Sequence, residues 1–194
     1  MPRSVVMGSG AIIWDYSRPD DVLLYESDLF KGCRDTVRYL SSIEVTLLLH
    51  LAFCARLARE DGSDPMTVAA CAAHDLHEVY MRDLPTGLKD LLPDYKRIEA
   101  LWEASIMRRI GVEMTPERAA YVKQVDVRAL LAEASYFRHP GYDTMCEQFS
   151  RHARDEDVFT LRRTWVPRVD PNMLWAIVAK AIRFSGGGSI RWGL

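Results

Sequence analysis

Residues 42–60, SIEVTLLLHLAFCARLARE, are apolar on almost every side when they are placed on a helix of 3.6 residues per turn. A helix that is hydrophobic all round has to be surrounded by other elements of the protein. Ser41 or Ser42 can serve as its N-cap, and Asp61 with Gly62 forms a stop signal. We therefore expect a fold in which other helices pack around a central buried one.

Helical signals recur along most of the remaining sequence. Apolar residues at helical spacing, together with start and stop residues, predict helices over Glu26 to Arg38, Pro65 to about Arg82, 95–111, 115–137 and 171–184. Asp20 or Asp21 can cap a short helix ahead of the first of these. This pattern predicts an all-α fold.

The segments between these helices carry strand or loop signals. Residues 5–16 hold β-branched and aromatic side chains around a Gly-Ser-Gly turn, which predicts a short N-terminal β-hairpin. Prolines and a glycine predict a loop over 82–94, and the polar residues 138–170 are predicted to be irregular. Residues 186–194 are predicted to form a loose tail.

The length of 194 residues suits a single domain. Within it we distinguish a hairpin and turn over 1–20, a helical core over 21–136, and a C-terminal extension with a last helix over 137–194. The sequence contains no internal repeat that would indicate a second unit.

Composition excludes several classes of partner. The net charge is −2 with both signs interspersed, so no basic field is available to hold a nucleic acid duplex. No stretch approaches the roughly 18 apolar residues of a membrane span, and the N-terminus lacks the apolar core of a signal peptide. The four cysteines contain no CxxC pair and are expected to be reduced. These features predict a cytoplasmic protein without a membrane partner.

The segment with most chemical content is 73–78, AHDLHE. On a helix, His74 and Asp75 point roughly 100° apart, so both reach one ion only if other helices supply further ligands. Asp126 is the best such partner, because a carboxylate inside an apolar run is costly to bury unless it is paired or binds a cation. Glu78, one turn after His74, could position or deprotonate a water that the ion activates. An isolated His-Asp doublet is also common on ordinary helices.

The longer pattern resembles a known enzyme family. HDLHEVYMRDLPTGLK, followed by VKQVDVRALLAEA, is similar to the HD-domain phosphohydrolases, in particular the 5′-deoxynucleotidases and their phage-type relatives that hydrolyse deoxynucleoside phosphates. The matching positions are His74, Asp75, Glu78, Asp83, Pro85, Thr86 and Lys89, then Asp126, Arg128, Ala129, Leu130 and Glu133. The resemblance covers residues 8–136.

The resemblance implies an HD-domain helical bundle with one divalent metal ion, which would be cobalt, manganese, zinc or magnesium. It implies that His74, Asp75 and Asp126 hold the ion and that Glu78 acts on the attacking water or the leaving group. Asp83 would lie at the same site and orient the substrate sugar. The implied substrate is a deoxynucleoside mono- or triphosphate, and the relatives are typically homo-oligomers.

The resemblance also implies residues that contact the substrate. Arg34 stands near the position of a phosphate-contacting arginine in the relatives, and Lys89 is a second candidate for that role. His77 would line the substrate pocket. Trp14, on the hairpin, offers a flat ring that could stack on a nucleobase, and a regular hairpin would place Ile12 and Tyr16 on the same face.

One position departs from the family pattern. The relatives carry a first histidine ligand on the preceding helix, and alignment by the C-terminal half of residues 42–60 places Thr46 there. His50 lies one turn later, and it is either a displaced fourth ligand or a core histidine. The alternative function is therefore a degenerate HD-domain protein that binds a nucleotide or a protein partner without turnover.

Overall fold

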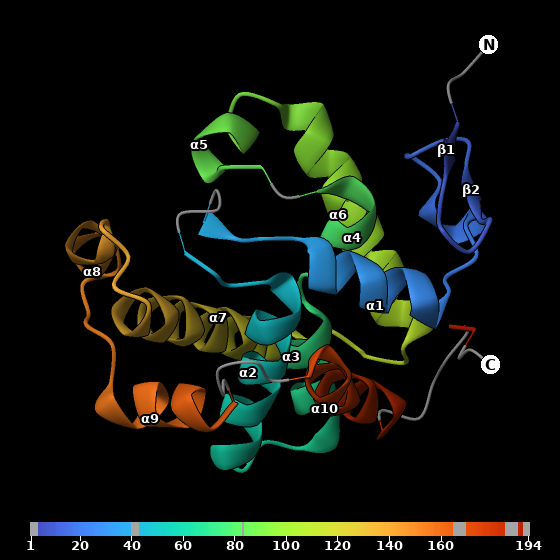
Figure 1. Ribbon diagram of the computed structural model, residues 1–194. Coiled ribbons are helices and arrows are strands. Elements are labelled where there is room, and N and C mark those ends of the chain that lie inside the picture. Colours follow the sequence, from blue (N-terminus) through green and yellow to red (C-terminus); the bar gives the residue numbers. More distant parts are fainter. Residues whose placement is uncertain (1–3, 40–42, 83, 165–169, 185–189, 192–194) are drawn as a thin grey trace.

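The computed structural model describes residues 4–39, 43–82, 84–164, 170–184 and 190–191, apart from the side chains of Thr86 and Phe184. The described part is mainly helical, with one two-stranded hairpin near the N-terminus (Figure 1). The all-α prediction with an N-terminal hairpin is confirmed.

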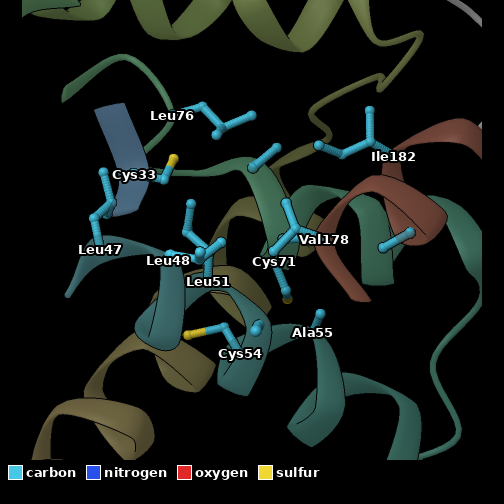
Figure 2. Close-up of a cluster of buried hydrophobic side chains, with 14 of the residues drawn as sticks. Cys33, Leu47, Leu48, Leu51, Cys54, Ala55, Cys71, Leu76, Val178 and Ile182 are labelled. Atoms are coloured by element: carbon cyan, nitrogen blue, oxygen red, sulfur yellow. The ribbon is translucent and has the colours of Figure 1, made fainter. Parts of the chain in front are cut away.

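α2 (Leu47–Glu60) forms the centre of the molecule. It contacts α1 (Glu26–Asp35), α3 (Pro65–Ala73), α7 (Pro116–Tyr136), α9 (Asp155–Thr164) and α10 (Pro171–Phe184). Every residue from 47 to 55 is buried. Figure 2 shows side chains of α2 gathered with Cys71 of α3 and with Val178 and Ile182 of α10. The central buried helix expected from the sequence is confirmed.

The start of α2 differs from the prediction. The helix begins at Leu47, where the Thr46 hydroxyl caps it by accepting a hydrogen bond from the Leu49 amide at 3.2 Å. Thr46 also pairs with Val37 in an antiparallel bridge, and the Leu47 amide donates to Thr36. The expected caps, Ser41 and Ser42, lie outside the described residues. The apolar residues before Leu47 are therefore buried in an extended segment and not in a helix.

The helix predicted from Pro65 to about Arg82 is interrupted. α3 ends at Ala73, residues 74–77 form a turn, and α4 (Glu78–Met81) follows. Within this turn the backbone tightens to bonds between residues three apart, such as that from the Leu76 amide to the Ala73 carbonyl at 3.0 Å. The break lies at the His-Asp doublet, so these two side chains project from a turn between helices.

The chain from the hairpin to α1 follows the expected order. β1 (Val5–Val6) pairs antiparallel with β2 (Ile12–Ile13), and a short 3-10 helix, η1 (Pro19–Asp21), follows. Gly10 in the hairpin loop has a φ of 87°, a conformation that favours glycine. α1 ends at Asp35, before the predicted Arg38, because the chain turns there into the extended segment that leads to α2.

The predicted loop over 82–94 contains the short helix α5 (Thr86–Lys89). α6 (Pro93–Arg109) follows and stops before Gly111, whose φ of 76° is suited to a helix end, as the sequence predicts. Thr115 then caps α7 by accepting a hydrogen bond from the Arg118 amide. α7 thus begins at the predicted Thr-Pro-Glu signal.

The prediction of irregular structure over 138–170 is wrong. This segment contains α8 (Tyr142–Phe149) and α9, which both pack against α7. Charge pairing joins α9 to the other helices, since Asp157 of α9 accepts two hydrogen bonds from Arg128 of α7. The many charged residues that suggested a loop are here partners of one another.

The loose tail predicted over 186–194 is also wrong where it is described. Ile190 is buried, and the Arg191 amide donates to the Leu24 carbonyl at 2.9 Å. The Glu26 amide in turn donates to the Arg191 carbonyl. These bonds join the end of the chain to the start of α1. Among the described residues, no helix combines the length and the apolar composition needed to cross a bilayer.

Candidate metal centre

Four side chains from three parts of the chain converge on one point. They are His50 on α2, His74 and Asp75 in the turn after α3, and Asp126 on α7. One ligand atom of each lies within 4.8 Å of the corresponding atoms of the others. Both imidazoles are buried, whereas the side chains of Asp75 and Asp126 are 20% and 18% exposed. The carboxylates therefore form the side of the cluster that faces solvent.

The separations fit one small cation. Nε2 of His50 lies 3.4 Å from Nε2 of His74 and 3.4 Å from Oδ1 of Asp126, and Nε2 of His74 lies 3.3 Å from Oδ2 of Asp75. Two ligands that are each about 2.1 Å from a tetrahedral ion are about 3.4 Å apart. Imidazoles and carboxylates are also usual ligands of divalent metal ions. The cluster is therefore a candidate metal centre.

The other ring nitrogen of each histidine makes a hydrogen bond to a neighbouring group. Nδ1 of His50 lies 2.9 Å from Oε1 of Glu133, and Nδ1 of His74 lies 3.0 Å from the carbonyl oxygen of Cys71. A carboxylate and a carbonyl oxygen accept hydrogen bonds, so both Nδ1 atoms are the donors. Such contacts fix the tautomer of a metal-binding histidine and orient its ring. Each Nε2 of the neutral imidazoles then presents a lone pair to the centre of the cluster.

Two lone pairs that face each other at 3.4 Å repel unless a positive charge lies between them. Burial lowers the pKa of His74, but the charge of Asp75 and hydrogen bonds with Asp126 outweigh burial and hold it well above its usual value. Burial likewise raises the pKa of Asp126, but hydrogen bonds from His50 and His74 hold it well below its usual value. The pocket as a whole favours a cation.

Arg38 lies beside the cluster, in the extended segment between α1 and α2. Its Nη1 donates to Oδ2 of Asp75 at 3.0 Å, and its side chain is 13% exposed. The Nε–H of Arg38 is buried and has no hydrogen-bond acceptor among the described residues. A guanidinium in this position places a second positive group next to a carboxylate of the candidate metal centre.

The structure corrects the interpretation of Thr46. Alignment places Thr46 at the first ligand position, but its hydroxyl caps α2 by accepting a hydrogen bond from the Leu49 amide. His50, one turn later, supplies the fourth donor. His50 contacts Asp126 and Glu133 of α7. The structure therefore favours His50 as the fourth candidate ligand.

Three more predicted residues, Glu78, His77 and Lys89, lie near the cluster. Glu78 is 4% exposed and opens α4 directly after the turn that carries His74 and Asp75. His77 lies with Lys89 around Glu99 of α6, with Nε2 of His77 at 3.5 Å and Nζ of Lys89 at 2.7 Å from Oε1 of Glu99. Asp83 lies outside the described residues.

Two predicted substrate contacts lie at the surface. Arg34 has a side chain that is 41% exposed and makes two hydrogen bonds to its neighbour Asp35. Trp14 is 62% exposed on the hairpin. Ile12 is exposed too, but Tyr16 is not on that face, because its ring packs 6.0 Å from the ring of Trp102. The predicted substrate contacts of Arg34 and Trp14 stay predictions.

Among the residues that contact the cluster, Arg38 and Glu133 have no role in the sequence analysis. The sequence places Arg38 at the end of a predicted helix. Because Arg38 is a basic residue one turn after Arg34, it is an equal candidate for an anion contact. Glu133 was noted as a matching position without a role, and it is fully buried against His50. A glutamate inside an apolar helix was a usable signal, since such a group is rarely buried without a partner.

Fold and site together define a mainly helical protein with a partly buried cluster of two histidines and two aspartates. Over 122 residues the chain is 27% identical to the uncharacterized protein YfdR of Escherichia coli (strain K12). The match covers 62% of this chain and 64% of that protein, which is less than two thirds of its length. No family model matches the chain.

Proposed function

We propose that the protein is a divalent-metal-dependent phosphohydrolase of the HD type that acts on deoxynucleoside phosphates. The observation that carries the proposal is the convergence of His50, His74, Asp75 and Asp126 on one point. The motif resemblance supports the same function, since three of these residues match its histidine and aspartates in type and spacing.

The four donors fit a divalent ion in number, chemistry and separation. A bound ion would neutralise charge on the phosphate and lower the pKa of water at the site. Glu133 and the Cys71 carbonyl hold the two imidazoles with Nε2 directed at the ion. These contacts are the chain's own contribution to a preorganised centre.

Polar residues around the donors suit a phosphate ester. Arg38 presents a guanidinium beside Asp75, where it can bind a phosphate oxygen and stabilise charge that develops during hydrolysis. Glu78, buried directly after the turn, is the candidate general base or acid. Lys89, His77 and Glu99 are the candidates for contacts to the sugar or to further phosphates.

The test is release of inorganic phosphate from a panel of deoxynucleoside mono-, di- and triphosphates with added manganese, cobalt, zinc or magnesium. We expect metal-dependent release that is lost in Asp126→Ala. Asp143→Asn, an exposed position on α8, is the matched control and should retain full activity. Stoichiometric metal in a folded protein that releases no phosphate from any substrate would overturn the proposal.

The non-catalytic alternative makes a different prediction in the same experiment. A degenerate HD-domain protein would bind a nucleotide without releasing phosphate. That alternative rests on a missing fourth ligand at Thr46, but His50 offers a fourth donor instead. We therefore retain hydrolysis as the function that the geometry supports best.

A further inference from the structure

A tyrosine next to Arg38 contacts the carboxylate that holds His50. Oη of Tyr39 lies 2.8 Å from Oε2 of Glu133, and Oε1 of Glu133 lies 2.9 Å from Nδ1 of His50. Each oxygen of this fully buried carboxylate therefore has its own donor. Tyr39 lies in the segment between α1 and α2, whereas Glu133 lies on α7, so the contact joins parts that are far apart in the sequence.

The Tyr39 hydroxyl is the donor in this contact. Burial and the charge of Glu133 raise the pKa of Tyr39 well above its usual value, so the hydroxyl keeps its proton. The carbonyl oxygen of Leu130, about one turn earlier on α7, lies 3.1 Å from the same hydroxyl and is a second acceptor. The chain of contacts therefore runs from the Tyr39 hydroxyl through Glu133 to His50.

The backbone of Tyr39 shows that its position is imposed by its surroundings. Its φ is 55°, a left-handed conformation that bulky residues rarely adopt and that persists only where other contacts hold it. The ring of Tyr39 packs 5.3 Å from the ring of His139, just after α7. Ring and hydroxyl thus both attach this residue to α7 and its C-terminal end.

We propose that Tyr39 is a positioning residue of the metal centre, because its hydroxyl fixes Glu133 in the orientation that directs Nε2 of His50 at the ion. This inference rests on the proposed metal dependence of the protein. Without the hydroxyl, Oε2 of Glu133 loses this donor in a site that is closed to solvent, and the carboxylate is free to turn away from His50. Partners of a metal-binding histidine tune metal affinity in this way.

The test measures zinc affinity of the full chain by competition with a chelator. Tyr39→Phe keeps the ring and removes the hydroxyl, and we expect the affinity to fall about 3- to 10-fold, since the lost contact is one step further from the ion than Glu133. Tyr121→Phe is the matched control, because the Tyr121 hydroxyl also contacts a carboxylate, that of Asp61 at 2.6 Å, which is none of the four donors. Urea unfolding of both metal-free variants measures the accompanying loss of stability.

Two further measurements separate positioning from a merely structural role. If Tyr39 acts through Glu133, the double variant Tyr39→Phe/Glu133→Gln should bind zinc within about twofold of Glu133→Gln alone. The visible absorption of bound cobalt(II), which reports the geometry of its ligands, should also change in Tyr39→Phe and stay unchanged in Tyr121→Phe. Fully additive losses in the double variant would show that Tyr39 does not act through Glu133.

The outcomes distinguish this inference from the proposed function. Stoichiometric zinc with equal affinity in the unmodified protein and in folded Tyr39→Phe overturns the role of Tyr39 and leaves the metal centre in place. Weakened zinc binding in Tyr39→Phe, in a protein that releases no phosphate from any deoxynucleotide, supports the role of Tyr39 and overturns hydrolysis. Failure to bind zinc, cobalt, manganese or magnesium overturns both.

Discussion

Glu133 determines which ring nitrogen of His50 carries the proton in the candidate metal centre. Its carboxylate is fully buried, accepts the His50 Nδ1–H at 2.9 Å and accepts the Tyr39 hydroxyl at 2.8 Å. Glu133→Gln keeps the size of the side chain but removes the negative charge that makes Nε2 of His50 a strong donor. We expect zinc affinity to fall about 10- to 100-fold.

Competition with a zinc chelator measures this change. The control is Glu117→Gln, because Glu117 is an exposed carboxylate near the start of the same helix. Urea unfolding of the metal-free variants separates an effect on metal affinity from a general loss of stability. Unchanged zinc affinity in folded Glu133→Gln would contradict the role assigned to this contact.

At the residue scale, the sequence predicted three of the four side chains that converge in the candidate metal centre. His74 and Asp75 are adjacent, and Asp126 is a lone acid in an apolar run, so their types and positions carry the signal. The sequence alone leaves open whether the fourth ligand is missing at Thr46 or supplied by His50, because the answer depends on where α2 begins. Arg38 reaches Asp75 through tertiary packing between residues 37 positions apart, which no local pattern connects.

Thr46 caps α2, whereas His50 is one of the four candidate donors, and this difference is testable. Thr46→Ala removes the cap hydrogen bond and should lower the free energy of unfolding by about 1 kcal/mol without changing metal affinity. His50→Ala should lower metal affinity strongly, because it removes a donor from the cluster. Urea unfolding and chelator competition measure the two effects. If Thr46→Ala weakened metal binding as much as His50→Ala, the separate roles assigned to the two residues would be refuted.

The crossing of α1 and α4 holds the turn with the His-Asp doublet near α1. A Cβ placed on Gly32 of α1 would lie 2.3 Å from Cγ1 of Val79 on α4. Gly32→Ala gains roughly 1 kcal/mol in helix propensity, but overpacking against a short β-branched side chain costs about 1–3 kcal/mol. We expect a net loss of stability in urea unfolding. Gly87→Ala, whose Cβ would meet open space, is the control, and a Gly32→Ala protein more stable than the unmodified one would refute close packing here.

At the element scale, helices are predicted correctly where apolar residues at helical spacing coincide with capping residues. The prediction fails where other forces act. α7 and α10 follow their apolar patterns. The break between α3 and α4 was missed because residues 74–77, HDLH, contain no glycine or proline to signal it. There, Nδ1 of His74 and of His77 each bond to the backbone carbonyl three residues earlier, which competes with regular helix bonding.

Across the whole molecule, a buried ion network joins the C-terminal extension to the helices of the core. Arg128 of α7 bonds to Asp157 of α9 and to Asp61 at the end of α2. In the sequence, Arg128 is only one of the positions that match the family motif. Its partner Asp157 lies in the polar segment after residue 137, where no helix is predicted. Such pairing depends on residues 29 and 67 positions apart, which local patterns do not connect.

The same network predicts how stability changes with pH. Burial raises the pKa of Asp157, but hydrogen bonds from Arg154 and Arg128 outweigh it, so the pKa in the folded state lies below its usual value. A carboxyl group with a lowered folded pKa stabilises the protein above its unfolded pKa of about 3.9, and this contribution is lost as the pH falls through the folded value. The free energy of unfolding should therefore drop on acidification below about pH 4.

Asp157→Asn isolates this contribution, because asparagine cannot titrate. The variant should be less stable than the unmodified protein near neutral pH, since it leaves the buried Arg128 with an incomplete set of charged partners. It should also lose less stability between neutral pH and about pH 3. Urea unfolding at both pH values measures the difference, with Asp143→Asn on exposed α8 as the control. An equal acid-induced loss in Asp157→Asn and in the unmodified protein would show that α9 is held to α7 by packing alone.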